Sequence, residues 1–77
     1  MDLLSVKKGQ WVRVKMIRGG VGVSSKLQSL GILPGDTLRI VREAPFGGPV
    51  LVEVSGREIA LGRGVAQKIE VEELSSP

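Results

Sequence analysis

Glycine and proline break this chain at short intervals, and brief runs of alternating apolar and polar residues lie between them. Eleven glycines and four prolines occur in 77 residues. Short alternating runs are typical of strands with one buried face, whereas an amphipathic helix needs a longer stretch with a period near four. The pattern predicts a single all-β domain over residues 1–77, with one short helix.

Five segments carry the strand pattern, and turn residues separate them. In the first segment, Val12, Val14 and Met16 alternate with Arg13 and Lys15, which predicts one buried and one exposed face. Between later segments, Pro34-Gly35 indicates a type II turn and Ser55-Gly56 a two-residue hairpin turn. The predicted strands, which together suggest a small five-stranded SH3-like barrel, cover residues 11–16, 37–42, 50–54, 57–61 and 68–72.

The sequence also predicts a short helix between the first two strands. Ser25 followed by Gln28 fits a capping box, and Gly31 can supply the left-handed residue that ends a helix. The preceding segment 19–22 is then expected to be a flexible crossover. A single helical turn is expected at 62–66, and residues 75–77 are expected to fray.

Side-chain parity defines a candidate core. Each predicted strand contributes its inward-facing apolar residues, and the helix contributes two leucines three positions apart. Leu27 and Leu30 are expected to seal one end of the barrel. The full set is Val12, Val14, Met16, Leu27, Leu30, Ile32, Leu38, Ile40, Val50, Val52, Val54, Ile59, Leu61, Ala66, Ile69 and Val71.

The missing residue types restrict the chemistry. The chain has no cysteine and no histidine, so disulfides, thiolate or imidazole metal ligands and Ser-His or Cys-His catalysis are excluded within one chain. No enzyme activity and no cofactor are expected. A cysteine-free domain of this size favours a reducing cytoplasm, and neither a signal peptide nor a membrane-spanning apolar run is recognisable.

Two weaker signals point to ligands, and each has a simpler explanation. Glu70, Glu72 and Glu73 could offer oxygen ligands to a hard cation, but a solvated edge that discourages strand pairing is the preferred interpretation. The glycines of segment 19–22 lie ahead of Ser24-Ser25-Lys26, yet the spacing of a phosphate-binding loop is absent. No metal site is therefore predicted.

A family resemblance covers nearly the whole chain. Its most specific part is Leu27-x-x-Leu30-Gly31-Ile32-x-Pro34-Gly35-Asp36, and the second half adds Gly48-Pro49-Val50, Ile59-Ala60-Leu61-Gly62, Ala66 and Ile69-x-Val71. In these segments the chain resembles the ferrous-iron transport protein A (FeoA) family. The resemblance implies an SH3-like barrel in the bacterial cytoplasm that associates with the large membrane GTPase that carries ferrous iron inward.

Two alternative functions stay open beside this adaptor role. Related domains occur as C-terminal parts of metal-dependent repressors, although the chain's own Met1 and the lack of a DNA-binding segment favour a free-standing protein. A nucleic-acid-binding barrel is the other alternative, because Arg13, Lys15, Arg39 and Arg42 are expected on outer strand faces. Only two aromatic residues could stack on bases, and the net charge is +3, so nucleic acid is the less favoured partner.

Several apolar residues are candidates for contact with a protein partner. Trp11, Val41 and Leu51 have the outward parity of their strands, and Phe46 lies in a loop rich in Pro and Gly. Together they could form an exposed patch suited to a partner. If the helix is displayed on the surface instead of packed, Leu27 and Leu30 join these candidates.

Overall fold

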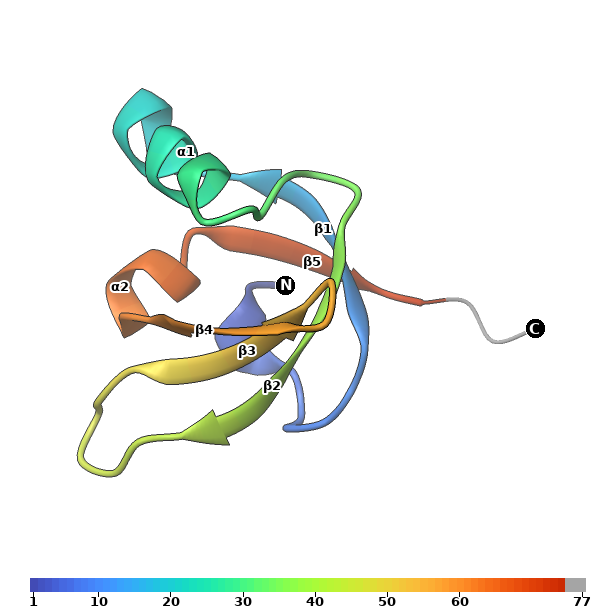
Figure 1. Ribbon diagram of the computed structural model, residues 1–77, viewed down its shortest axis with the longest axis vertical. Coiled ribbons are helices and arrows are strands. Elements are labelled where there is room, and N and C mark those ends of the chain that lie inside the picture. The colour runs from blue at the N-terminus through green and yellow to red at the C-terminus, as the bar shows by residue number, and fades with distance from the viewer. Residues whose placement is uncertain (75–77) are drawn as a thin grey trace.

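The computed structural model describes residues 1–74, so the expected fraying of residues 75–77 lies outside the described residues. In this part of the chain, five antiparallel strands form one sheet in the order β4-β3-β2-β1-β5 (Figure 1). Inward-facing residues of all five strands belong to one buried cluster, because the sheet is strongly bent around it. The predicted five-stranded all-β class is confirmed; the strands are β1 Val12–Ile17, β2 Thr37–Glu43, β3 Val50–Val54, β4 Arg57–Leu61 and β5 Ile69–Glu73.

Within residues 1–74, three short helical segments complete the fold: η1 Leu3–Ser5, α1 Gly20–Ser29 and α2 Arg63–Ala66. The expected start of α1 at Ser25 is wrong, because the helix begins five residues earlier and Ser25 lies within it. Gly19 adopts a φ of 96° and turns the chain directly from β1 into α1. Val23 then packs against the core. This tertiary contact stabilises the helical conformation of a glycine-rich segment whose own helix propensity is poor.

The helix ends as its sequence predicts. Gly31 has a φ of 87°, and Ile32 donates its backbone N–H to the oxygen of Leu27 at 2.9 Å. Gly35 has a φ of 97°, and the Asp36 N–H bonds to the oxygen of Leu33 at 3.0 Å. Both glycines occupy the left-handed region, where a Cβ is strained. The chain therefore reverses within six residues and enters β2.

Most of the predicted core is buried, but three members are not fully so. Leu30 and Ile59 are half-buried against the core, and Met16 is 50% exposed, so its place in the core was wrong. The cause is an irregularity in the β1–β5 ladder between Val14 and Met16, which reverses the parity of the strand beyond Val14. Ile17, the next residue, packs against the core instead.

One core residue comes from outside the strands and was not predicted. Leu3 in η1 is fully buried. The first residues reach this position because the oxygen of Met1 accepts the N–H of Val71 at 2.8 Å and Asp2 forms a bridge with Glu70. The N-terminal segment thus closes one side of the core beside β5. Across residues 1–74, no helix is long and apolar enough to cross a membrane.

Candidate functional site

The outer face of strands β2, β3 and β4 carries an apolar pocket that opens to solvent. Leu51 of β3 lies directly opposite Ala60 of β4 on one side and opposite Arg42 of β2 on the other. The pocket has a volume of about 190 Å³, and its walls are Arg42, Ala44, Pro49, Val50, Leu51 and Ala60. We call these six residues the outer-face pocket.

A β-bulge in β2 shapes this pocket. The β2–β3 register passes from Ile40↔Val52 to Arg42↔Leu51, so Val41 is the additional residue. Strict alternation after Leu38 and Ile40 would turn Arg42 inward. The bulge keeps Arg42 on the outer face beside Leu51 and leaves Val41 half-buried. The expectation that both residues face outward therefore depends on a bulge that the sequence pattern did not reveal.

Phe46 stands apart from the pocket. It lies at the tip of the loop between β2 and β3, is fully exposed and has a φ of 59°. Two backbone hydrogen bonds define the loop, from the Ala44 N–H to the Pro49 oxygen at 3.0 Å and from the Gly48 N–H to the Pro45 oxygen at 3.2 Å. The loop thus presents the ring to solvent, close in sequence to the pocket walls but not among them.

Trp11 belongs to a different part of the same outer face. The Arg39 guanidinium lies over the indole ring, 4.9 Å from its centroid. Arg39 also donates from Nε and Nη2 to Oε1 of Glu53 at 2.9 and 2.7 Å. The indole is 39% exposed. Trp11 therefore packs against an ion pair, which is a polar arrangement next to the apolar pocket.

The two leucines Leu27 and Leu30 differ in burial. Leu27 is fully buried in the core, so it is not available to a partner in the folded chain. Leu30 is half-buried, and its main-chain oxygen accepts a hydrogen bond from Nη2 of Arg57 at 3.2 Å. The packed interpretation of the helix therefore holds for Leu27, and only Leu30 keeps an exposed part.

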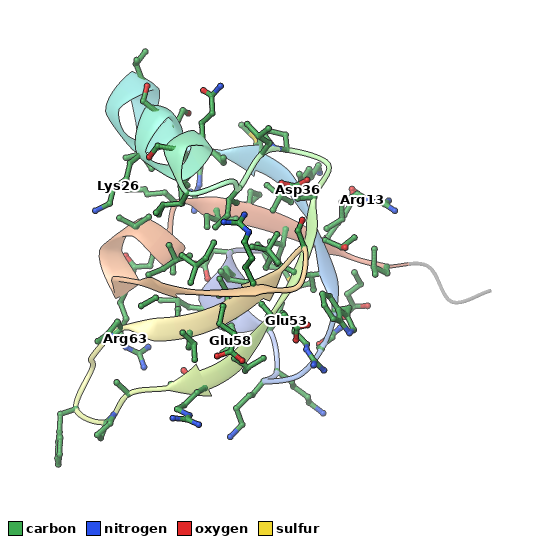
Figure 2. All side chains as sticks on the ribbon, in the orientation of Figure 1. Arg13, Lys26, Asp36, Glu53, Glu58 and Arg63 are labelled. Atoms are coloured by element: carbon green, nitrogen blue, oxygen red, sulfur yellow. The ribbon has the colours of Figure 1, made fainter. Side chains whose placement is uncertain are left out.

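Sequence reasoning missed the contribution of Ala60 and Arg63. Ala60 follows the inward-facing Ile59 in β4, so its outward parity was a signal that the strand pattern contained. Arg63 donates from Nε to the oxygen of Gly48 at 3.0 Å and lies 3.4 Å from Glu43. Figure 2 shows Arg63 reaching toward the start of β3. This contact fixes the loop that supplies two walls of the pocket, and no local sequence motif predicts the contact.

The carboxylates at the end of the chain do not form a metal cluster. No group of three acidic side chains that could hold a metal ion occurs within residues 1–74. The Met1 ammonium donates a hydrogen bond to Oε1 of Glu70 at 2.8 Å, and Arg18 lies 3.5 Å from the other oxygen. The hydrogen bond from the ammonium, with the nearby Arg18 and Lys15 charges, lowers the pKa of Glu70. Glu72 lies opposite Arg13 on β1.

A family model and a similar protein sequence both point to one family. The model of the FeoA domain matches residues 1–73. The Methanocaldococcus jannaschii protein that bears the name Fe(2+) transport protein A is 42% identical over 71 residues, which are 92% of this chain and 84% of that protein.

Solved structures share the fold. Iron(II) transport protein A from Clostridium thermocellum has a TM-score of 0.89 at 32% identity; the match covers 96% of this chain but 46% of that one, so this chain spans under half its length. A crystal structure of an iron uptake regulatory protein (FeoA) has a TM-score of 0.85 at 31% identity and is covered over 96% of both chains. ScaR with bound Zn²⁺ has a TM-score of 0.86 at 26% identity, over 96% of this chain and 37% of that chain. The chain therefore belongs to the FeoA domain family.

Proposed function

We propose that this chain is a cytoplasmic adaptor that binds the cytoplasmic part of a membrane GTPase transporter and supports uptake of ferrous iron, without catalysing a reaction itself. Family membership supports the iron-transport context. The observation that carries the binding role is the outer-face pocket, where Leu51, Ala60 and Pro49 leave apolar surface open to solvent. Binding of a partner that covers apolar surface of this kind is favourable, because the surface is removed from water.

A titration with the isolated cytoplasmic GTPase domain of a ferrous-iron transporter tests this role. Trp11 is the only tryptophan of the chain, so its fluorescence reports binding at the outer face. We expect saturable binding in at least one of three states, namely nucleotide-free, GDP-bound or bound to a non-hydrolysable GTP analogue. Absence of binding in all three states would contradict the proposal.

Two matched variants locate the contact. Leu51→Ser removes an apolar wall of the pocket and should weaken binding roughly tenfold, because losing a central apolar anchor costs about 1–2 kcal/mol. Val21→Ser is the control: Val21 is 83% exposed but lies in α1, outside the pocket. Equal effects of the two substitutions would place the contact elsewhere on the surface.

A second candidate function is regulation within a longer repressor-like chain. The structural likeness to ScaR and to a manganese-dependent transcriptional repressor, with TM-scores of 0.86 for both, favours it. The gene context separates the two candidates. A neighbouring reading frame for a large GTPase with many membrane spans supports the adaptor, whereas an in-frame DNA-binding segment supports the repressor domain.

Nucleic acid is the remaining alternative partner. Arg39, one of the four basic residues on which this alternative depends, is already paired with Glu53. A phosphate-binding surface loses affinity steeply as salt rises, because neutralised phosphates release counterions. We therefore expect titrations with single-stranded RNA and DNA to give weak binding. Tight binding that falls steeply with salt would overturn the adaptor assignment.

A further inference from the structure

The free edge of β4 presents unpaired backbone groups directly beside the outer-face pocket. β4 lies at one edge of the sheet and, among residues 1–74, pairs only with β3. Ser55-Gly56 joins the two strands, with φ values of 53° and 76°, so Val54 and Arg57 form the hydrogen-bonded pair that closes a two-residue hairpin. This closing pair fixes the direction of every backbone group along β4.

Hydrogen-bonded and non-hydrogen-bonded pairs alternate along an antiparallel ladder. Counting from the closing pair, Ile59 and Leu61 also bond to β3, whereas Glu58 and Ala60 occupy the non-bonded pairs. The backbone N–H and C=O groups of Glu58 and Ala60 therefore point away from β3. Both residues are exposed, and neither makes another backbone hydrogen bond within residues 1–74.

The side chains on the outer face beside this edge change from apolar to negatively charged along β4. Ala60 is a wall of the outer-face pocket, together with Leu51 opposite it. Glu58 lies on the same outer face of β4, directly opposite Glu53 of β3, and Figure 2 labels both residues. Glu53 is bound by Arg39, while Glu58 has no cation within 4.0 Å among the described residues. The face is thus apolar beside Ala60 and negative beside Glu58.

We propose that β4 binds an extended segment of a partner protein as a sixth, antiparallel strand. Such a strand would take up the free backbone groups of Glu58 and Ala60. Its residue opposite Ala60 would place an apolar side chain in the outer-face pocket, and its residue opposite Glu58 would carry a positive charge. Because the added strand runs antiparallel, its sequence pattern is apolar-x-basic, where x faces the same side as Ile59.

Charge distinguishes this occupant from a second copy of the chain. A second β4 edge would bring its own Glu53 and Glu58 to the same outer face, and like charges across strands are unfavourable. A basic residue instead neutralises Glu58. The Arg57 side chain, which crosses from β4 to the Leu30 oxygen, limits the open edge at its N-terminal end. The site is therefore short, with two backbone positions and one pocket.

The inference rests on the proposed role as a partner-binding domain and names the kind of segment that is bound. The probe is an end-capped heptapeptide with Leu at its third position, Lys at its fifth and Thr elsewhere, added to the isotope-labelled full chain. We expect the largest amide chemical-shift changes at Glu58 and Ala60. Replacing Lys by Glu in the peptide should weaken binding roughly tenfold, because an attractive cross-strand pair becomes repulsive.

Two changes test the backbone pairing itself. N-methylation of the peptide's Leu amide removes a donor without any change in the protein, and Ala60→Pro removes the corresponding donor of β4. The Ala60 N–H is not part of the β3 ladder, so a proline on this edge should keep the fold. Both changes should reduce the affinity at least tenfold, and the Ala60→Pro variant should melt close to the parent chain.

The remaining outcomes separate failure of this inference from failure of the adaptor role. Binding that tolerates N-methylation would show that the pocket accepts a side chain without strand addition. Concentration-dependent dimers that Ala60→Pro disrupts would identify a second copy as the occupant. Undiminished binding of Ala60→Pro to the transporter's GTPase domain would reject strand addition while leaving the adaptor role intact. Failure of the parent chain to bind that domain would reject the adaptor role.

Discussion

The guanidinium of Arg57 ties the first residue of β4 to the C-terminal end of α1. Its Nη2 atom donates to the main-chain oxygen of Leu30 at 3.2 Å, although the two residues lie 27 positions apart. The same guanidinium occupies the space that a side chain at Gly31 would enter. Gly31, at a φ of 87°, therefore meets a backbone requirement for glycine, and a side chain there would also have to displace this flexible guanidinium.

A pair of glycine substitutions separates these two effects. Gly35 has a φ of 97° but open space around it, so Gly35→Ala should cost only the left-handed strain, about 1–2 kcal/mol. Gly31→Ala should cost more, because the Arg57 guanidinium must also move. Denaturant unfolding measures both. Equal losses would show that the contact between Arg57 and the α1 end is easily displaced.

The two leucines of α1 should differ in their effect on stability. Leu27→Ala leaves a cavity in the buried core and should cost about 2–5 kcal/mol. Leu30 is half-buried, so Leu30→Ala should cost less, about 1–2 kcal/mol. Thermal melts rank them. An unchanged melting temperature in Leu30→Ala, together with loss of partner binding, would reassign Leu30 from packing to the binding surface.

The different burial of Leu3 and Met16 gives a paired test of the core and of the β1 irregularity. Leu3 is fully buried, and Leu3→Ala should lower the free energy of unfolding by about 2–5 kcal/mol. Met16 is 50% exposed, so Met16→Ala should change it by less than about 1 kcal/mol. Denaturant unfolding of both variants decides the point. A larger loss at Met16 would mean that the strict alternation of β1 continues beyond Val14 to Met16.

The contact between Met1 and Glu70 should make stability depend on acid pH. The ammonium hydrogen bond lowers the pKa of Glu70 below its ordinary value of 4.5, so the stabilisation is present above that value. It should be lost as the pH falls from 4.5 through the lower pKa of the folded state. Melting temperatures measured across this range should show a shallower acid decline in Glu70→Gln than in the parent chain.

Acetylation of the N-terminus provides a control that keeps the carboxylate. It removes the ammonium charge, so the acid decline should flatten as in Glu70→Gln. High salt should also reduce the difference, because the pair lies at the surface. If the acetylated chain lost stability in acid as steeply as the parent chain, then Arg18 and Lys15, and not Met1, would be the main cause of the lowered pKa of Glu70.

The local sequence determined the fold class and most strand boundaries. Alternation between turn residues sets which side of a strand is buried, and glycine sets where the backbone can turn left-handed. Both are short-range effects, so β3, β4, the Ser55-Gly56 turn and the end of α1 at Gly31 followed from the sequence. The outward parity of Trp11 and Leu51 followed in the same way.

Tertiary structure decided the features that depend on distant partners. The bulges at Lys15 and Val41 change parity because the neighbouring strand fixes the register, and α1 extends back to Gly20 because Val23 finds the core. The outer-face pocket likewise needs three strands side by side, with Arg63 holding the loop from 15 residues away. Such contacts join residues far apart in the chain, and their energies exist only once the sheet has assembled.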